Sequence, residues 1–195
     1  MKEAVARTLR ERGAHAVVAA RSKLAYQGSA MELRLEGRID FAADRCRLDG
    51  PTGAVVCDGP TQYSQLPDGR WTRQGEPGRW TNVHPRWGLE LLARCTTSEK
   101  ETVPRRFELE FDPKLAAAIT HAGIASEWAA GGSAQTDEEG RVTRIEVRLE
   151  ADDAALNWTI TFDAFGPGEP IALPPTEKVV ELSEHIEELV QNQPG

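Results

Sequence analysis

The strictest constraint in this chain of 195 residues is a regular alternation of apolar and polar side chains near its C-terminal end. Every second side chain is apolar in two runs: Ile145, Val147 and Leu149 in the first, and Leu156, Trp158, Ile160 and Phe162 in the second. Successive side chains of a strand point to opposite faces, so each run predicts a strand with one buried face. Residues 151–155 form the turn of this hairpin. The Gly- and Pro-rich segment 165–175 then leaves the sheet.

The same alternation recurs earlier in the chain. It predicts strands at 30–41, with Met31, Leu33, Leu35, Ile39 and Phe41 on one face, and at 104–111, with Phe107, Leu109 and Phe111 on one face. Gly37 falls on the apolar face of the first of these, where a missing side chain permits a bend or a close neighbour. Turn residues delimit further short strands at 44–49, 53–58 and 61–66. A hairpin turn at 67–70 then leads into residues 71–73.

Four helices complete the expected set, at residues 3–12, 86–94, 113–130 and 176–191. Asp112 is a good N-cap for the third of them and Pro113 a good first helical residue. The order of elements has no βαβ rhythm, which excludes a parallel sheet. We therefore predict one α+β domain over residues 1–195. Its strongly curved antiparallel sheet, a half-barrel, has helices packed on its concave face.

Charge and hydropathy exclude several classes of partner. The net charge of −8 argues against nucleic acid as a partner. No apolar stretch reaches the roughly 20 residues that span a bilayer. The N-terminal residues lack the apolar run of an export signal, so a cytoplasmic location is expected for the chain as written. An extracytoplasmic location is the alternative if such a signal has been trimmed.

The cysteines and histidines predict neither a cofactor nor a metal site. Cys46, Cys57 and Cys95 stand in no metal-binding spacing, and the four histidines are scattered. Cys46 and Cys57 flank a predicted hairpin. Buried free thiols are the favoured interpretation, and a cross-strand disulfide is left open.

No catalytic set is recognisable, so an enzyme is not expected. Ser22, Ser64 and Ser98 lie in no GxSxG context, and no histidine has a recognisable spacing to them. Most carboxylates alternate with arginines along the predicted strands. This pattern is typical of a solvated face with cross-strand ion pairs.

Several segments together resemble the actinobacterial LolA-like and LppX/LprG-type lipoproteins. They are GRIDFAADRCRL, DGPTQYSQLPDGRWTR, HPRWGLELLARC, VPRRFELEFDP and the ending DEEGRVTRIEVRLE…WTITFDAFGPGEPIALPP. The resemblance covers nearly the whole chain. It implies a half-barrel sheet whose helices enclose a hydrophobic cavity for acyl chains. In that family the segment with Trp71 and Arg73 is a landmark of the fold and no catalytic site.

The resemblance suggests non-catalytic binding of a lipid or another amphiphile. The candidate cavity-lining residues are Met31, Leu33, Leu35, Ile39, Phe41, Phe107, Leu109, Phe111, Ile145, Val147, Leu149, Trp158, Ile160 and Phe162. The alternative is that these residues form a filled core, in a protein-interaction or regulatory module with the same fold. Alternation alone does not separate the two, because a packed face and a cavity wall have the same pattern.

Three tryptophans lie within seventeen positions of each other: Trp71, Trp80 and Trp87. One interpretation is a rim that gates the cavity or contacts a partner, because tryptophan offers a large contact area. The other is that Trp71 and Trp87 seal the sheet edge and the short helix, and for Trp87 this is the favoured one.

Overall fold

The computed structural model describes residues 1–24, 30–75, 81, 83–119, 129–151 and 154–191, and within these ranges only the backbone of 22–24, 30–31, 117–119, 151 and 154. The described helices are α1 (Lys2–Thr8), α2 (Arg86–Cys95), α3 (Pro113–Ile119) and α4 (Leu182–Gln191), with a 3-10 turn at Thr176–Lys178. The described strands are β1 (Gly13–Leu24), β2 (Ala30–Asp40), β3 (Arg45–Gly50), β4 (Gly53–Asp58), β5 (Thr61–Gln65), β6 (Trp71–Gln74), β7 (Thr96–Val103), β8 (Arg106–Phe111), β9 (Ala129–Thr136), β10 (Val142–Ala151), β11 (Ala154–Asp163) and β12 (Val179–Glu181).

All twelve described strands belong to one sheet, in the order β12-β6-β5-β4-β3-β2-β1-β11-β10-β9-β8-β7. Two antiparallel meanders, β1–β6 and β7–β11, join where β1 pairs with β11. Short β12 pairs in parallel with β6, and every other neighbouring pair is antiparallel. The sheet is open, with β12 and β7 at its edges.

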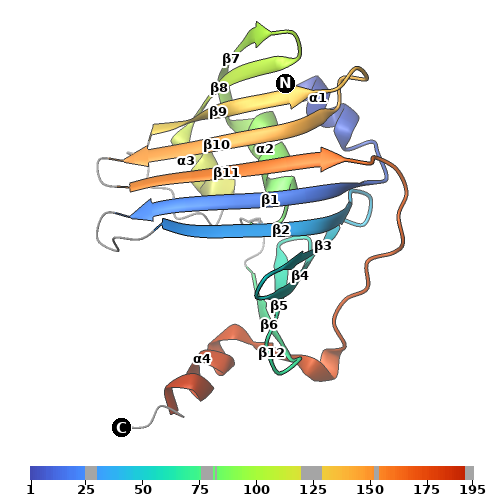
Figure 1. The fold of residues 1–195 in the computed structure, drawn as a ribbon, viewed down its shortest axis with the longest axis vertical. Coiled ribbons are helices and arrows are strands. Elements are labelled where there is room, and N and C mark those ends of the chain that lie inside the picture. The colour runs from blue at the N-terminus through green and yellow to red at the C-terminus, as the bar shows by residue number, and fades with distance from the viewer. Residues whose placement is uncertain (25–29, 76–80, 82, 120–128, 152–153, 192–195) are drawn as a thin grey trace.

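The helices α2 and α3 lie against one face of the sheet, behind it in the view of Figure 1. α1 contacts β10 and α2, at the N-terminal end of the chain. The main core forms between this helical layer and the apolar face of the strands. The α+β architecture predicted from the sequence, a mostly antiparallel sheet with helices on one face, is thus confirmed.

The alternating segments form the expected strands. β2, β8, β10 and β11 occupy the predicted ranges to within two residues, and so do the three short strands β3, β4 and β5. Gly37 permits a close neighbour, as predicted, because a Cβ at this position would collide with the backbone carbonyl oxygen of Arg47. Asp112 caps α3 as predicted, since its Oδ1 accepts the N–H groups of Lys114 at 2.8 Å and Leu115 at 3.1 Å.

Three helix boundaries differ from the prediction. The first helix ends at Thr8 because the chain is already extended by Arg12, whose carbonyl accepts the N–H of Phe41. Ala129 and Ala130, predicted to be helical, begin β9, a strand that their small side chains did not signal. The last helix begins at Leu182, because Val179–Glu181 pairs with β6 instead.

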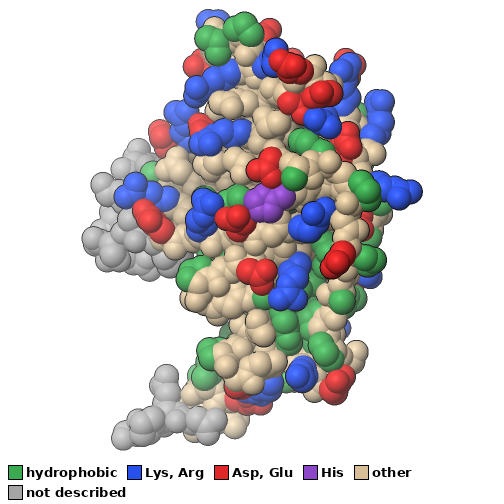
Figure 2. Space-filling view, turned by 45° about the vertical axis from the view of Figure 1, so that its right-hand side comes forward, with side chains coloured by type: hydrophobic (Ala, Val, Ile, Leu, Met, Phe, Trp, Pro, Cys, Tyr) green, Lys and Arg blue, Asp and Glu red, His purple; other side chains and the backbone are tan. Residues whose placement is uncertain are grey.

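The outer face of the sheet is covered by charged side chains of both signs (Figure 2). Arg21 forms an ion pair with Glu32 across β1 and β2, as the alternation predicted. His15 lies between Asp163 at 2.8 Å and Glu36 at 3.3 Å. Such exposed pairs contribute little to stability, about 0–1 kcal/mol each, so the fold is stabilised mainly from its inner face. Among the described residues no helix is long and apolar enough to cross a membrane.

Candidate functional site

The predicted apolar rows meet on the face of the sheet that α2 covers. Leu35 pairs with Val18, Val18 with Ile160, and Ile160 with Ile145, so one continuous row crosses four neighbouring strands. Ala134 of β9 extends this row by one strand, opposite Ile145. The sequence therefore identified the inner face of the sheet correctly.

Most of the predicted cavity-lining side chains are buried in the main core. The buried ones are Leu35, Ile39, Phe41, Leu109, Phe111, Ile145, Val147, Leu149, Trp158, Ile160 and Phe162. Leu33 and Phe107 are half-buried and pack against the same core. The side chain of Met31 lies outside the described residues.

α2 packs closely against the middle of the inner face. A Cβ on Gly88 would lie only 2.6 Å from Cδ1 of Ile160 and 3.1 Å from Cδ1 of Ile145. Trp87 contacts Trp158 edge-to-face, with ring centroids 5.7 Å apart. The missing side chain of Gly88 permits this approach. The close packing leaves no room for a ligand between α2 and the sheet at this point.

The inner face has more exposed side chains where β1 and β11 run past the Ala20–Trp158 pair, toward Leu24 and Ala154. Ala20 of β1 lies in register with Leu33 on one side and with Trp158 on the other. Ala20, Leu33 and Leu156 are half-buried and continue the apolar face past the fully buried centre. Ala20, Leu33 and Leu156 thus remain partly accessible at this end, whereas Leu149, opposite Leu156, is buried.

Trp71 and Trp87 do not form an exposed rim. The side chain of Trp87 is 1% exposed and belongs to the core, which agrees with the interpretation favoured for it. Trp71 is 7% exposed and packs in a second, smaller cluster with Ala54 and Val56. Trp80 lies outside the described residues. Trp71 and Trp87 thus expose little surface to a partner in this conformation.

A buried histidine, not singled out from the sequence, positions the start of α2. His84 is fully buried, and its Nδ1 accepts the backbone N–H of Arg86 at 3.1 Å. Burial lowers the pKa of His84 to about 3, so the ring is neutral at ordinary pH. Arg86 in turn donates from Nη1 to Oδ1 of Asp44 at 2.9 Å, which ties α2 to the turn after β2. Desolvation raises the pKa of Asp44 above its usual value.

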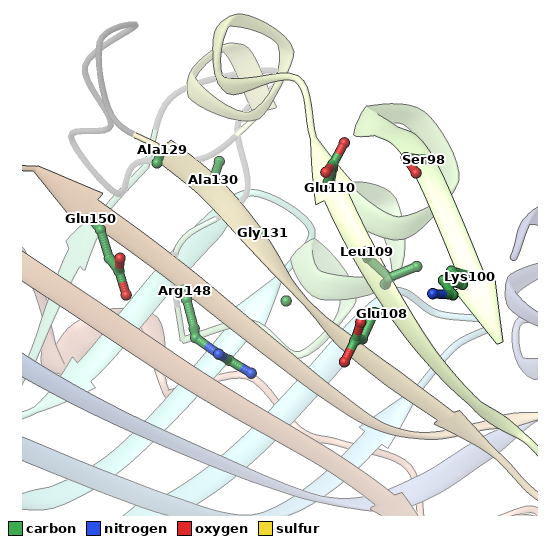
Figure 3. A pocket seen from close by; sticks show the side chains of 11 residues that line it. Ser98, Lys100, Glu108, Leu109, Glu110, Ala129, Ala130, Gly131, Arg148 and Glu150 are labelled. Atoms are coloured by element: carbon green, nitrogen blue, oxygen red, sulfur yellow. The ribbon is translucent and has the colours of Figure 1, made fainter. Parts of the chain in front are cut away.

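A groove of about 470 Å³ lies on the outer face of the sheet (Figure 3). Glu108 and Glu110 of β8 border it on one side, and Arg148 and Glu150 of β10 on the other, with Gly131 of β9 between them. Burying an apolar ligand among these charges would be unfavourable, so this groove does not suit an acyl chain. Among the described residues no group of three or more His, Cys, Asp or Glu is arranged to hold a metal ion.

The cysteines are buried free thiols, the interpretation favoured from the sequence. Cys46 and Cys57 are directly opposed in the β3–β4 pair, and Cys95 ends α2. Burial raises the pKa of Cys95 to about 11 and that of Cys46 well above its usual value. The raised thiol pKa values make Cys46 and Cys95 poor nucleophiles, and burial shields all three cysteines from solvent.

Comparison with known proteins finds likeness in fold alone. No protein family and no curated protein matches the sequence. The fold is similar to lipoprotein LppX of Mycobacterium tuberculosis, at 12% identity over 88% of this chain and 94% of LppX, with a TM-score of 0.46. It is also similar to LprF of Mycobacterium bovis, at 9% identity over 88% and 92% of the two chains, with a TM-score of 0.42. A LolA superfamily protein of Nitrosomonas europaea matches at 10% identity over 88% and 92%, with a TM-score of 0.37. These are proteins of the kind that the sequence motifs resemble.

Proposed function

We propose that this protein binds an amphiphile without transforming it, and that the apolar part of the ligand lies against the inner face of the sheet. The observation that carries the proposal is the continuous apolar face from β2 to β9, which two short helices cover. Each methylene buried there would contribute about 0.8 kcal/mol to binding. The resemblance of the sequence motifs to lipid-carrying lipoproteins supports the same proposal.

The proposed site is the half-buried end of the inner face, beside Ala20 and Leu33. α2 fills the space over Ile145 and Ile160, so a ligand at the centre would have to displace this helix. At Ala20 the wall is a methyl group between Leu33 and Trp158, and the side chains of Leu33 and Leu156 are partly accessible. An acyl chain entering here would extend the existing core without burying a charge.

The test is mass spectrometry of organic extracts from the natively purified protein, with an unrelated protein from the same host as control. We expect a lipid at near-stoichiometric amount in this protein alone. Ala20→Phe should fill the site and remove the lipid. Ala19→Phe, on the opposite face of the same strand, is the matched control and should retain it. A clean extract, together with an unchanged melting temperature on adding lipids, would refute the proposal.

The packing of α2 supports a second function, a protein-interaction module with a filled core. Trp87, Leu89 and Leu92 are at most 1% exposed and occupy the position that a ligand would take in the middle of the sheet. A clean extract would favour this function. It would then require a binding surface on the exterior of the molecule.

A further inference from the structure

Two of the three cysteines lie directly opposite each other on neighbouring strands. Cys46 of β3 pairs with Cys57 of β4, in the antiparallel hairpin that turns at residues 51 and 52. Both are buried in the main core. Burial, and after it a hydrogen bond with Cys57, raises the pKa of the Cys46 thiol. Each of these cysteines therefore has a second sulfur within reach.

The register of the hairpin brings the two residues to a separation that a disulfide can span. Two positions further along the ladder, Gly59 donates its N–H to the carbonyl of Asp44 at 2.8 Å. Hydrogen-bonded pairs recur at every second position, so Cys46 and Cys57 are also such a pair, with Cα atoms about 5.5 Å apart. Disulfides join residues whose Cα atoms are roughly 4.4–6.8 Å apart. The two sulfurs can be joined without a change of register.

Cys95 is in a different place. It is the last residue of α2, whereas Arg86 at the start of this helix contacts Asp44, two residues before Cys46. At 1.5 Å per residue, Arg86 and Cys95 are about 13 Å apart along the helix axis. The carbonyl of Cys95 accepts the N–H of Asp112, just beyond the end of β8. A bridge from Cys95 to Cys46 would require α2 to move.

Burial decides when the two thiols can react. A disulfide forms by attack of a thiolate on another disulfide. In the folded protein both sulfurs are covered, and the raised pKa of Cys46 keeps its thiol protonated. In the unfolded chain both thiols are accessible and have the ordinary pKa of about 8.5. Since a two-residue turn joins β3 and β4, the cysteines meet through local contacts, which form early in folding.

We propose that Cys46 and Cys57 form a cross-strand disulfide while the chain folds in an oxidising environment. The oxidant is another disulfide, such as oxidised glutathione. One cysteine thiolate attacks it and releases a glutathione thiolate, and the second cysteine thiolate then attacks the mixed disulfide and releases the other glutathione. Two protein thiols become one disulfide, one glutathione disulfide becomes two thiols, and no proton is gained or lost overall.

In a reducing environment both thiols stay free and buried, as they are in the structure. The disulfide is independent of the proposed lipid site, because neither cysteine lies beside Ala20 or Leu33. Its effect is on the hairpin itself, whose two strands it would join covalently.

The experiment starts from the reduced, urea-unfolded protein, which is refolded by dilution into a mixture of oxidised and reduced glutathione. The intact mass should fall by about 2 Da, because two hydrogens are lost. Peptide mapping without reductant should join the peptides of Cys46 and Cys57, and the Cys95 thiol alone should then react with DTNB in urea. Closing a loop of about 12 residues restricts the unfolded chain, so the oxidised protein should melt about 5–10 °C above the reduced one.

The matched control is Cys95→Ala, which should show the same loss of mass and the same rise in melting temperature. Cys46→Ala and Cys57→Ala should show neither. The folded, reduced wild type should stay reduced in the same glutathione mixture, because its sulfurs are covered. Rapid oxidation of this folded sample would overturn the proposed order of events. Three free thiols after refolding, a stable mixed disulfide with glutathione, a bridge to Cys95 or an unchanged melting temperature would each overturn the disulfide.

Discussion

The burial of His84 makes the stability of this protein depend on pH between about 6.5 and 3. In the unfolded chain a histidine has a pKa of about 6.5, whereas burial lowers the pKa of folded His84 to about 3. Below pH 6.5 the unfolded chain therefore takes up a proton that the folded protein does not. The contribution of His84 to the free energy of unfolding is therefore greatest above pH 6.5. It decreases as the pH falls and reaches its minimum near pH 3.

The size of the effect follows from the two pKa values. Each pH unit inside this window changes the free energy of unfolding by about 1.4 kcal/mol, so the step from pH 7 to pH 5 costs about 2 kcal/mol. His84→Asn removes the titration while its side-chain oxygen can still accept the N–H of Arg86, the bond that Nδ1 accepts at 3.1 Å. The variant should be less stable than the wild type at pH 7, since the smaller side chain leaves space in the core.

The assay is urea unfolding of both proteins at pH 5, 6, 7 and 8. The difference between the two free energies of unfolding removes the pH dependence of all other titrating groups, because both proteins contain them. We expect the advantage of the wild type over the variant to shrink by about 2 kcal/mol between pH 7 and pH 5. A difference that stays constant within about 0.5 kcal/mol would show that His84 takes up its proton in the folded state, and would refute the reasoning.

Three further predictions concern packing. Gly88→Ala should lower the free energy of unfolding by about 1–2 kcal/mol in chemical denaturation. The new Cβ would press on Ile160, and this overpacking should outweigh the gain in helix propensity. A variant as stable as the wild type, or more stable, would contradict the close approach of α2. Thr8→Val should lower the free energy of unfolding by about 1–3 kcal/mol in the same assay, because Thr8 Oγ1 accepts the buried N–H of Val142 at 2.7 Å. Thr8→Ser keeps the hydroxyl and should cost less. Equal losses in both variants would argue against this hydrogen bond. Cys46, Cys57 and Cys95 should not react with a thiol reagent such as DTNB until the protein unfolds, and fast labelling of the native protein would disprove their burial.

The sequence predicted the strands that have one apolar and one polar face. β10 and β11 follow from alternation because each must bury one row of side chains. β7 was missed because it lies at the sheet edge with nearly all its side chains exposed, so no apolar row marks it. β9 was missed because Ala129 to Gly132 has side chains too small to show a pattern.

The sequence predicted which side chains share the inner face of the sheet, but not how closely the helices pack on that face. The inner rows were identified because β-strand geometry places alternate residues on one face. Whether helices fill the space above them depends on the approach of α2, and that depends on Gly88, a single glycine that no periodicity marks. The exposure of Ile186 and Leu189 was likewise unpredictable, because an apolar stripe does not reveal which side of its helix meets the domain.

The topology of the sheet has a consequence for biosynthesis. The first meander has two edges, β1 and β6, and both are covered by the last part of the chain, β11 on one and β12 on the other. During translation both edges remain open hydrogen-bonding templates until residues 154–163 and 179–181 have been made. Such edges are sites of aggregation, and pairing over such long sequence separations slows folding. The first meander therefore stays exposed at both edges until β11 and β12 have been made and have paired.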